Sequence, residues 1–361
     1  MGYPDTFTGF CVDSPQTWNQ FQRAELTPKP FGDHDIDVEV EACGVCGSDV
    51  HTVTGGWGPY QGPLCVGHEI VGRAVRVGSH VRGISRGDRV GVGGQVWACL
   101  ECDLCRDGQE NYCAELIDTY NDRYRDGSRS HGGFASHVRA HEYFTFRMPE
   151  GLEPAVAAPL LCAGITTYAP LSCAGIGPGR TVGVMGIGGL GHLALQFSRA
   201  LGAETYALTT SRSKVDDCLA LGAGGVIVTS EEDGWEDEWR SRFDMILCCS
   251  DMAHKLDMGK CMKLMRPGGD FHMLGVPDED LARMSAGDFI WTRARLTGSH
   301  LGNHQEMEAM LRLAAEKGVK PWVEVLKMGE DGCREAVERV RANKVRYRLA
   351  MTGYDEAFGR G

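Results

Sequence analysis

The pattern of polar and apolar residues predicts a mostly β first part of the chain. Acidic and apolar residues alternate over Asp35–Val40, and this period of two is typical of a short antiparallel strand. Residues 41–155 are rich in glycine and contain few long helical periods. We therefore expect an irregular β domain there, followed by a helical segment over Pro154–Cys173.

From residue 180 onward, short apolar runs alternate with helix-like segments. The runs are Thr181–Met185, Tyr206–Leu208, Val226–Val228, Met245–Leu247 and Phe271–Leu274. A helix is expected over Leu193–Leu201 and another ending at Leu221. Strands that alternate with helices indicate a doubly wound parallel sheet. After about residue 297 we expect a helix around Glu306–Glu316 and a closing strand, Arg346–Leu349.

Length, composition and charge limit the number of domains and the class of protein. A length of 361 residues fits roughly two domains, and 42% hydrophobic residues suffice for two cores. The formal charge of −12 argues against a nucleic-acid-binding protein, which would carry a basic face. The first residues, Met1–Asp5, show no signal-peptide pattern, and no apolar run approaches the ~18 residues of a membrane span. We expect a cytoplasmic protein with no membrane partner.

Four of the fifteen cysteines form a compact cluster. They follow the pattern Cys-x2-Cys-x2-Cys-x7-Cys and are Cys99, Cys102, Cys105 and Cys113. Four thiolates at such spacing can wrap one tetrahedral Zn²⁺ in a closed structural site. An iron–sulfur cluster also uses four cysteines, but its familiar spacings differ. Free buried cysteines are the remaining alternative, and the spacing favours zinc.

A second group of candidate ligands starts at residue 43. Cys46 and His68 could hold a catalytic metal together with a third ligand from far along the chain. Catalytic zinc keeps an open position, and two cysteines with one histidine form a known ligand set. Cys43 competes with Cys46, but a free cysteine is often a small buried residue. A lone histidine such as His68 is also more often structural than a ligand.

A glycine-rich turn follows the first strand of the alternating region. It fits G-x-G-x-x-G and comprises Gly186, Ile187, Gly188, Gly189, Leu190 and Gly191. Such glycines allow a tight turn and close approach to the pyrophosphate of a dinucleotide at a helix N-terminus. NAD-binding proteins place an acid about 20 residues further on. This chain has instead Thr209, Thr210, Ser211, Arg212 and Lys214. Hydroxyls and cations suit a 2′-phosphate, so we expect NADP(H), although a solvated loop is the alternative.

Taken together, these motifs resemble the zinc-dependent medium-chain alcohol dehydrogenases, in particular the cinnamyl-alcohol-dehydrogenase-like branch. The resemblance covers nearly the whole chain. It rests on Cys43–Asp49, Gly67–Val81, the four-cysteine lobe, Tyr120–Asp122, Leu160–Gly164 and Asn343–Arg348. It implies an α/β protein with a GroES-like catalytic domain over 1–155, including the zinc lobe at 95–115. A Rossmann domain would follow over 156–296, with a return to the catalytic domain over 297–361 and a homodimer through the nucleotide domains.

The resemblance also implies roles for single residues. Cys46, His68 and Cys162 would hold the catalytic zinc, and Glu69 would be an alternate ligand. Ser48 would exchange the proton of the alcohol, and His51 would pass it to water. Asp49 would orient His68. From the residues alone, Asp49 could instead cap a turn or a helix, and His51 could be an exposed bystander.

The expected substrate pocket departs from the family pattern. Asp118 stands where an aromatic residue is expected, and His300 follows a Gly-Ser pair that apolar residues usually follow. The aromatic residues expected near this pocket are Trp57, Tyr60 and Trp97. A carboxylate and an imidazole beside zinc would favour a hydroxylated or amine-bearing substrate, although both side chains could simply face solvent.

The sequence therefore predicts an enzyme that holds two Zn²⁺ ions and transfers hydride between NADPH and an aldehyde, and in reverse oxidises a primary alcohol. Specialised metabolism is a plausible setting. One alternative is reduction of a conjugated C=C or iminium group on the same scaffold. The other is a non-catalytic, NADPH-binding redox sensor. The intact set Cys46, Ser48, His68 and Cys162 favours the first.

Overall fold

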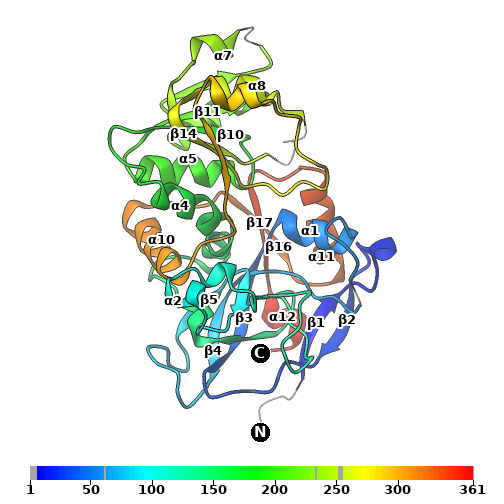
Figure 1. Cartoon of the computed structure of the whole chain (residues 1–361). Coiled ribbons are helices and arrows are strands. Elements are labelled where there is room, and N and C mark those ends of the chain that lie inside the picture. The colour runs from blue at the N-terminus through cyan, green and yellow to red at the C-terminus, as the bar shows by residue number, and fades with distance from the viewer. Residues whose placement is uncertain (1–5, 61, 232–233, 251–254, 361) are drawn as a thin grey trace. The chain divides into compact units, whose positions relative to one another are not determined.

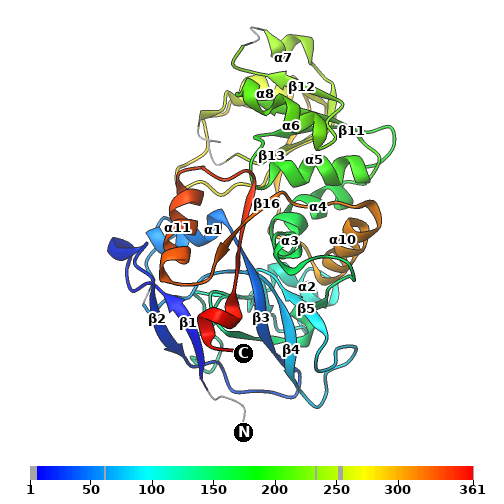
Figure 2. The same ribbon diagram turned by 180° about the vertical axis from the view of Figure 1, so that it is seen from behind.

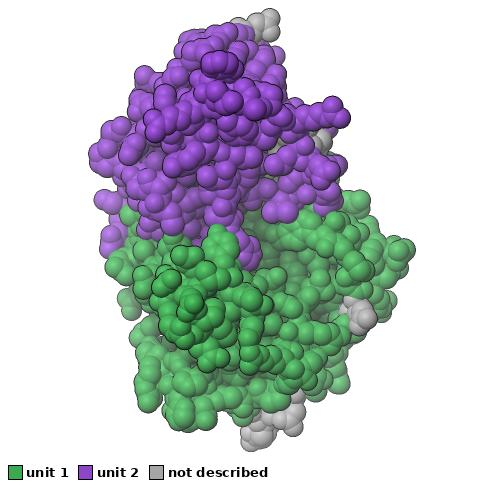
Figure 3. Space-filling model, in the orientation of Figure 1, with its two compact units in different colours: residues 1–163, 303–315, 320–361 green, residues 164–302, 316–319 purple. Residues whose placement is uncertain are grey.

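The computed structural model describes residues 6–60, 62–231, 234–250 and 255–360, so Met1–Asp5, on which the targeting expectation rests, lie outside it. The chain folds into two compact units, which Figure 3 colours separately. Unit 1 comprises residues 1–163, 303–315 and 320–361. Unit 2 comprises residues 164–302 and 316–319.

A seven-stranded sheet forms the centre of unit 1 (Figures 1 and 2). Six of its strands follow the order β16-β17-β3-β4-β5-β9, and β8 also pairs with β3. Their bounds are β3 Asp35–Val45, β4 Glu69–Val77, β5 Arg89–Val92, β8 His137–His141, β9 Thr145–Arg147, β16 Val323–Lys327 and β17 Arg348–Thr352. Only the β16–β17 pair is parallel among these described strands. This agrees with the predicted mostly β domain.

Shorter elements surround this sheet. Two small antiparallel sheets pair β1 with β2 and β6 with β7. These strands are β1 Phe7–Cys11, β2 Gln22–Leu26, β6 Gln95–Trp97 and β7 Ile117–Asp118. Among the described residues, the α-helices that lie wholly in this unit are α1 Gly47–Thr54, α2 Asp103–Arg106, α3 Pro154–Ala157, α11 Glu330–Arg341 and α12 Tyr354–Phe358.

The predicted strand Asp35–Val40 is confirmed as the start of β3, but two of its three acidic residues are not solvated. Asp35 and Asp37 are buried. The Arg139 guanidinium binds both carboxylate oxygens of Asp37, with Nε 2.6 Å from Oδ1 and Nη2 3.0 Å from Oδ2, and Lys29 pairs with Asp35. Alternation predicted the strand correctly, whereas the cation that binds Asp37 comes from a segment 102 positions away.

Unit 2 is a doubly wound parallel sheet, as predicted. Its strand order is β12-β11-β10-β13-β14-β15, and every adjacent pair is parallel. The strands are β10 Thr181–Met185, β11 Glu204–Thr209, β12 Gly225–Val228, β13 Phe243–Cys248, β14 Met265–Met273 and β15 Arg295–Gly298. The order reverses beside β10, and such a switch point is where α/β sheets bind dinucleotides.

In the part of the chain that the structure describes, six helices accompany these strands, and a further helix has residues in both units. The six are α4 Ala163–Cys173, α5 Gly191–Ala200, α6 Val215–Ala220, α7 Trp235–Glu238, α8 Met258–Lys263 and α9 Ala286–Ile290. Helix α10, His304–Lys317, contributes residues to both units. The predicted helices over 193–201 and 306–316 are thus confirmed as α5 and α10.

Two predicted elements differ in detail. The helical segment 154–173 is interrupted, because α3 passes into a 3₁₀ turn over Ala158–Leu161 and α4 begins only at Ala163. The closing strand begins at Arg348 rather than Arg346, since the backbone N–H of Arg346 donates to Glu324 Oε1 at 3.0 Å instead of to a neighbouring strand.

No single described helix is long and apolar enough to cross a membrane. One bent pair, Pro154–Leu161 with Ala163–Cys173, passes by length and composition, with an angle of 49° between its helices.

Candidate active site

Cys46 lies at the junction between β3 and α1, where the chain turns from strand into helix. It is the N-cap residue of α1. The buried carboxylate of Asp49 accepts the backbone N–H of Cys46 through Oδ2, at 2.8 Å, and that of Gly67 through Oδ1, at 3.0 Å. A single side chain therefore fixes both the segment that carries Cys46 and the segment that leads to His68.

Four metal-ligating side chains meet at this junction. Ligand atoms of Cys46, His68, Glu69 and Cys162 all lie within 4.8 Å of one another, and all four residues are buried. Cys46 Sγ lies 3.9 Å from Cys162 Sγ, and His68 Nε2 lies 3.1 Å from the same sulfur. The interruption of the helix at Cys162, with φ −127° and ψ −71°, places this residue between two helical segments.

The imidazole of His68 is oriented by two groups behind it. Its Nδ1 lies 3.2 Å from the hydroxyl of Tyr120 and 3.6 Å from Asp49 Oδ1. Nε2 therefore faces the two cysteines, the arrangement that ligating histidines adopt when a second group holds the other nitrogen. The orienting role of Asp49 stays a prediction, and its distance to His68 is compatible with that role. The contact of Tyr120 was not predicted.

Glu69 reaches the group from the start of β4 and is paired with Arg348 at the start of β17. Both residues are buried, and Arg348 Nη2 donates to Glu69 Oε1. Among the described residues, Glu69 Oε2 has no hydrogen-bond partner. Gly44 lies opposite Glu69 in the β3–β4 ladder, and a Cβ at Gly44 would lie 1.9 Å from Oε2. The glycine thus leaves room for the carboxylate.

These residues fit a metal ion chemically. Two thiols, an imidazole and a carboxylate with an orphaned buried oxygen converge on one point, and zinc binds this donor set. The hydrogen bond from Cys162 lowers the pKa of the Cys46 thiol, and the same contact raises the pKa of Cys162. Cys43, the competing candidate, is buried elsewhere, its Sγ donating to the Gly44 carbonyl at 3.4 Å.

The four-cysteine lobe forms a second, separate cluster. Its sulfur–sulfur distances are 3.8 Å for Cys99–Cys105, 3.9 Å for Cys102–Cys113 and 3.5 Å for Cys99–Cys113. A tetrahedron with Zn–S bonds of ~2.3 Å has sulfur–sulfur edges of about 3.8 Å. The geometry therefore fits one closed tetrahedral ion.

The expected proton relay lies on α1. Ser48 Oγ is 3.6 Å from Cys46 Sγ, so the hydroxyl is beside the ligand group. His51 lies one turn further along the helix, and its ring stacks on the indole of Trp57 with centroids 5.0 Å apart and planes 4° apart. Trp57, expected in the substrate pocket, is therefore a direct neighbour of His51.

The glycine-rich turn has the structural context that the motif requires. It follows β10 directly, and α5 begins at its last glycine. Gly186 has a φ of +85°, and a Cβ at Gly191 would lie 2.1 Å from the Gly186 carbonyl oxygen. A Cβ at Gly188 would meet no atom within 4 Å. The turn is thus tightly packed at both ends and open in the middle, as pyrophosphate binding needs.

The polar segment after β11 lies beside this turn. Lys214 Nζ donates to the Ile187 carbonyl at 2.6 Å, which joins the segment to the glycine-rich turn. Arg212 Nε lies 2.5 Å from Glu231 Oε2. Because both partners are largely exposed, this ion pair is weak.

The candidate pocket residues lie in different surroundings. Asp118, in β7, and His300 are both exposed, and they belong to different units. Tyr60 donates its hydroxyl to the Val53 carbonyl at 3.1 Å and lines a cavity of about 320 Å³ together with Cys65, Asn121 and Arg129. Trp97 contacts His141 edge to face.

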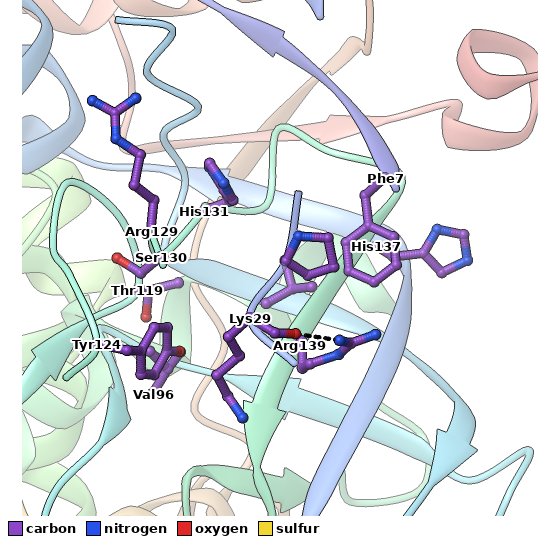
Figure 4. A pocket seen from close by; sticks show the side chains of 12 residues that line it. Phe7, Lys29, Val96, Thr119, Tyr124, Arg129, Ser130, His131, His137 and Arg139 are labelled. Carbon is purple, nitrogen blue, oxygen red and sulfur yellow. Dashed lines mark hydrogen bonds between the residues drawn. The ribbon is translucent and has the colours of Figure 1, made fainter. Parts of the chain in front are cut away.

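A smaller cavity, of about 20 Å³, lies nearby in unit 1 and is shown in Figure 4. Its lining includes Lys29, Arg129, His131, His137 and Arg139. None of the four metal-ligating residues lines it, so it is distinct from the candidate metal site.

Sequence reasoning missed two residues that contact the candidate metal ligands. Tyr120 and Arg348 appeared there only as parts of the Tyr120–Asp122 and Asn343–Arg348 segments. Arg348 lies 279 positions from Glu69. No local pattern indicates such a pairing, because it depends on the antiparallel pairing of β17 with β3.

Comparisons with known proteins agree with this geometry. Residues 32–150 match the alcohol dehydrogenase GroES-like domain, and residues 189–316 match the zinc-binding dehydrogenase family. The chain is 42% identical to NADP-dependent alcohol dehydrogenase 6 of Saccharomyces cerevisiae over 359 residues, 99% of each chain.

Solved structures give the same picture. A cinnamyl alcohol dehydrogenase from Sorghum bicolor matches with a TM-score of 0.90 and 32% identity, covering 96% of this chain and 98% of that one. A cinnamyl alcohol dehydrogenase from Helicobacter pylori complexed with NADP(H) matches with a TM-score of 0.87 and 27% identity, over 96% and 98% of the two chains.

Proposed function

The chain belongs to the zinc-dependent medium-chain alcohol dehydrogenases, and from that premise we propose that it reduces aldehydes with NADPH at Cys46, His68 and Cys162 and oxidises primary alcohols in reverse. The observation that carries this proposal is the convergence of these three side chains, with Ser48 beside them. The comparisons favour aldehyde and alcohol chemistry over reduction of a C=C or iminium group and over a non-catalytic sensor.

Each residue has a defined part in this proposal. Zinc held by Cys46, His68 and Cys162 supplies Lewis-acid polarisation of the carbonyl, while NADPH supplies the hydride. During reduction the Ser48 hydroxyl donates a proton to the developing alcohol oxygen. His51 then returns a proton to Ser48 from water, and in alcohol oxidation the protons move in the opposite direction.

The carboxylates of Asp49 and Glu69 lie next to the proposed zinc ligands and position them. Asp49 holds the backbone of Cys46 and Gly67 and lies behind Nδ1 of His68, so it fixes the tautomer that points Nε2 at the cysteines. Glu69 offers a further carboxylate oxygen to the same point while Arg348 neutralises its other oxygen. The lobe of Cys99, Cys102, Cys105 and Cys113 would hold a structural zinc.

Measurement of NADPH oxidation with a panel of aldehydes tests the function. We expect turnover of benzaldehyde or cinnamaldehyde that a chelator abolishes and added zinc restores. Ser48→Ala should lower kcat by about 10²-fold or more, because it removes the proton donor, while the metal content stays at two ions. No turnover across the panel by a protein with both zinc ions bound would overturn the proposal.

The nucleotide-binding part of the proposal assigns Gly186, Gly188, Gly189, Leu190 and Gly191 to the pyrophosphate. The 2′-phosphate would be bound by Thr209, Thr210, Ser211, Arg212 and Lys214. Arg212→Ala should raise the KM for NADPH at least about tenfold with little effect on NADH, because a charged hydrogen bond to phosphate is lost. Glu231→Gln is the matched control, since it removes the partner of Arg212 and keeps the cation.

The substrate class within the aldehydes follows from Asp118 and His300. If both contact substrate, hydroxylated or amine-bearing aldehydes are preferred. Asp118→Ala should then lower kcat/KM more for a polar aldehyde than for cinnamaldehyde. Equal effects on both aldehydes would remove Asp118 from the pocket.

We further propose a cytoplasmic homodimer that joins through unit 2. Strand β15 ends the order of its sheet, and the neighbouring Ile290 and Trp291 are 69% and 87% exposed. Exposed aromatic surface beside an unpaired strand edge suits a second copy of this chain. Trp291→Asp should convert the dimer to a monomer in light scattering, whereas Trp322→Asp, in unit 1, should not.

A further inference from the structure

We propose that Cys11 and Cys65 form a reversible cross-strand disulfide when the enzyme meets hydrogen peroxide, and that the bridge tethers the segment leading to His68. Both cysteines are free and buried. Neither belongs to the two metal-ligating groups found among the described residues. This modification site is separate from the proposed reaction, which uses neither thiol.

The backbone register places the two cysteines opposite each other. Val12 and Leu64 form an antiparallel bridge and exchange both hydrogen bonds, at 3.0 and 2.9 Å. Cys11 and Cys65 are the next residues opposite each other. Because hydrogen-bonded and non-hydrogen-bonded pairs alternate, they form a non-hydrogen-bonded pair, in which Cα atoms are about 4.5 Å apart. Disulfides join residues with Cα atoms about 4.4–6.8 Å apart. The backbone therefore meets the requirement with little movement.

The sulfur of Cys65 lies over the face of β1 that carries Cys11. A Cβ at Gly9 would be 2.9 Å from Cys65 Sγ, and Gly9 is two residues from Cys11 on the same strand. Side chains two apart on a strand share a face. Burial first, and then the neighbouring Cys11 thiol, raise the pKa of Cys65, so the two groups are close enough to affect each other.

A small oxidant can approach Cys65, the first thiol to react, through the cavity described above. Cys65 lines the cavity of about 320 Å³, together with Tyr60, Asp122 and Arg123. Hydrogen peroxide is only slightly larger than water and fits this volume. Because the thiol of Cys65 is protonated at neutral pH, oxidation is slower than at an exposed thiolate.

The chemistry balances in two steps. The sulfur of Cys65 attacks one peroxide oxygen, the O–O bond breaks, and one water leaves, so that a sulfenic acid remains. The sulfur of Cys11 then attacks the sulfenic sulfur, the S–S bond forms, and the S–O bond breaks with release of a second water. Two thiols lose two electrons in total, and one peroxide becomes two waters. A dithiol reductant reverses the reaction.

The disulfide would affect the active site because Cys65 lies close to His68 in the sequence. Cys65 precedes the proposed ligand His68 by three residues, and Gly67 between them is already held by Asp49. The disulfide would add a covalent tie from this segment to β1. We expect the oxidised protein to lose zinc to a chelator several-fold more slowly and to melt several degrees higher than the reduced protein.

Peptide mapping of the zinc-loaded enzyme after peroxide treatment tests the proposal. A linked pair of peptides containing Cys11 and Cys65 should form, should disappear after reduction, and should be absent in Cys11→Ala. The matched control is Cys333→Ala, which removes another buried thiol of the same core cluster and should leave the bridge intact.

The mapping also gives the result that would contradict the proposal. If Cys11 and Cys65 can still be alkylated after unfolding of the treated protein, while its zinc content stays at two ions, no bridge has formed. This result would leave the proposed dehydrogenase activity untouched, because that activity is measured on the reduced enzyme. Since the wild-type protein carries the main test, misfolding of a variant does not obscure it.

Discussion

The indole of Trp57 lies flat against the imidazole of His51, with ring centroids 5.0 Å apart and planes inclined by 4°. His51 is the proposed last member of the proton relay, and it projects from the helix that begins beside Cys46. A flat stack restricts rotation of the imidazole, so we infer a positioning role for Trp57 in the proposed relay.

The first prediction concerns this stack. His51→Gln should lower kcat by about tenfold or more, since the relay loses its proton acceptor, and added imidazole buffer should restore part of the rate. Trp57→Ala should have a smaller effect of the same kind, and Trp57→Phe should behave like the wild type. If buffer rescues none of these variants, His51 is a bystander.

The second prediction concerns the buried pair of Glu69 and Arg348. Arg348→Met should reduce the free energy of unfolding by about 3–5 kcal/mol, because it leaves a buried carboxylate without its cation. Thermal unfolding and metal analysis measure the effect. Arg147→Met is the control, since Arg147 forms a long, exposed pair with Asp88 and should cost at most about 1 kcal/mol. Equal losses in the two variants would contradict the assigned importance of the buried pair.

The third prediction tests the space in front of Glu69. Gly44→Ala would place a Cβ 1.9 Å from Glu69 Oε2 and should destabilise the fold by about 1–3 kcal/mol while weakening zinc retention. Gly47→Ala, three residues away in the first turn of α1, meets no atom within 4 Å and should be neutral or slightly stabilising. If the two variants lose zinc to a chelator at similar rates, the absence of a side chain at Gly44 is not needed to accommodate Glu69.

The fourth prediction is a dependence of stability on pH. Burial lowers the pKa of His131, which lines the small cavity of Figure 4, to about 4. An unfolded histidine titrates near 6.5, so the unfolded state binds more protons between pH 6.5 and 4. Stability is therefore lost as pH falls through this window, by up to about 2 kcal/mol between pH 7 and 5 from this residue.

Denaturant unfolding at both pH values checks the sign and the source of this effect. His131→Asn should flatten the pH dependence by that amount. His80→Asn, at a largely exposed position, should leave it unchanged. A slope that His131→Asn does not alter would assign the acid sensitivity to other groups, among them His137, whose pKa burial also lowers to about 4.

The sequence predicts those parts of the molecule that depend on neighbouring residues. The strand Thr181–Met185, the glycine-rich turn and α5 are contiguous, so their order and periodicity suffice. The four cysteines of the zinc lobe also lie within fifteen positions, and their sulfurs do converge.

The remaining features depend on long-range packing. Cys162 is 116 positions from Cys46, and only the family resemblance indicated it. The burial of Asp37 depends on Arg139, 102 positions away. The contact of Tyr120 with His68 spans 52 positions. Residue patterns describe local periodicity and carry no information about which distant segment covers a given face, so these contacts could not be read from them.

Anomalous scattering from crystals of the zinc-loaded protein, recorded on both sides of the zinc absorption edge, tests the central claim most directly. We predict two zinc peaks per chain: one bound by Cys46, His68 and Cys162, and one among Cys99, Cys102, Cys105 and Cys113. A single peak confined to the four-cysteine lobe, or a second peak bound by Cys43 in place of Cys46, would contradict the account.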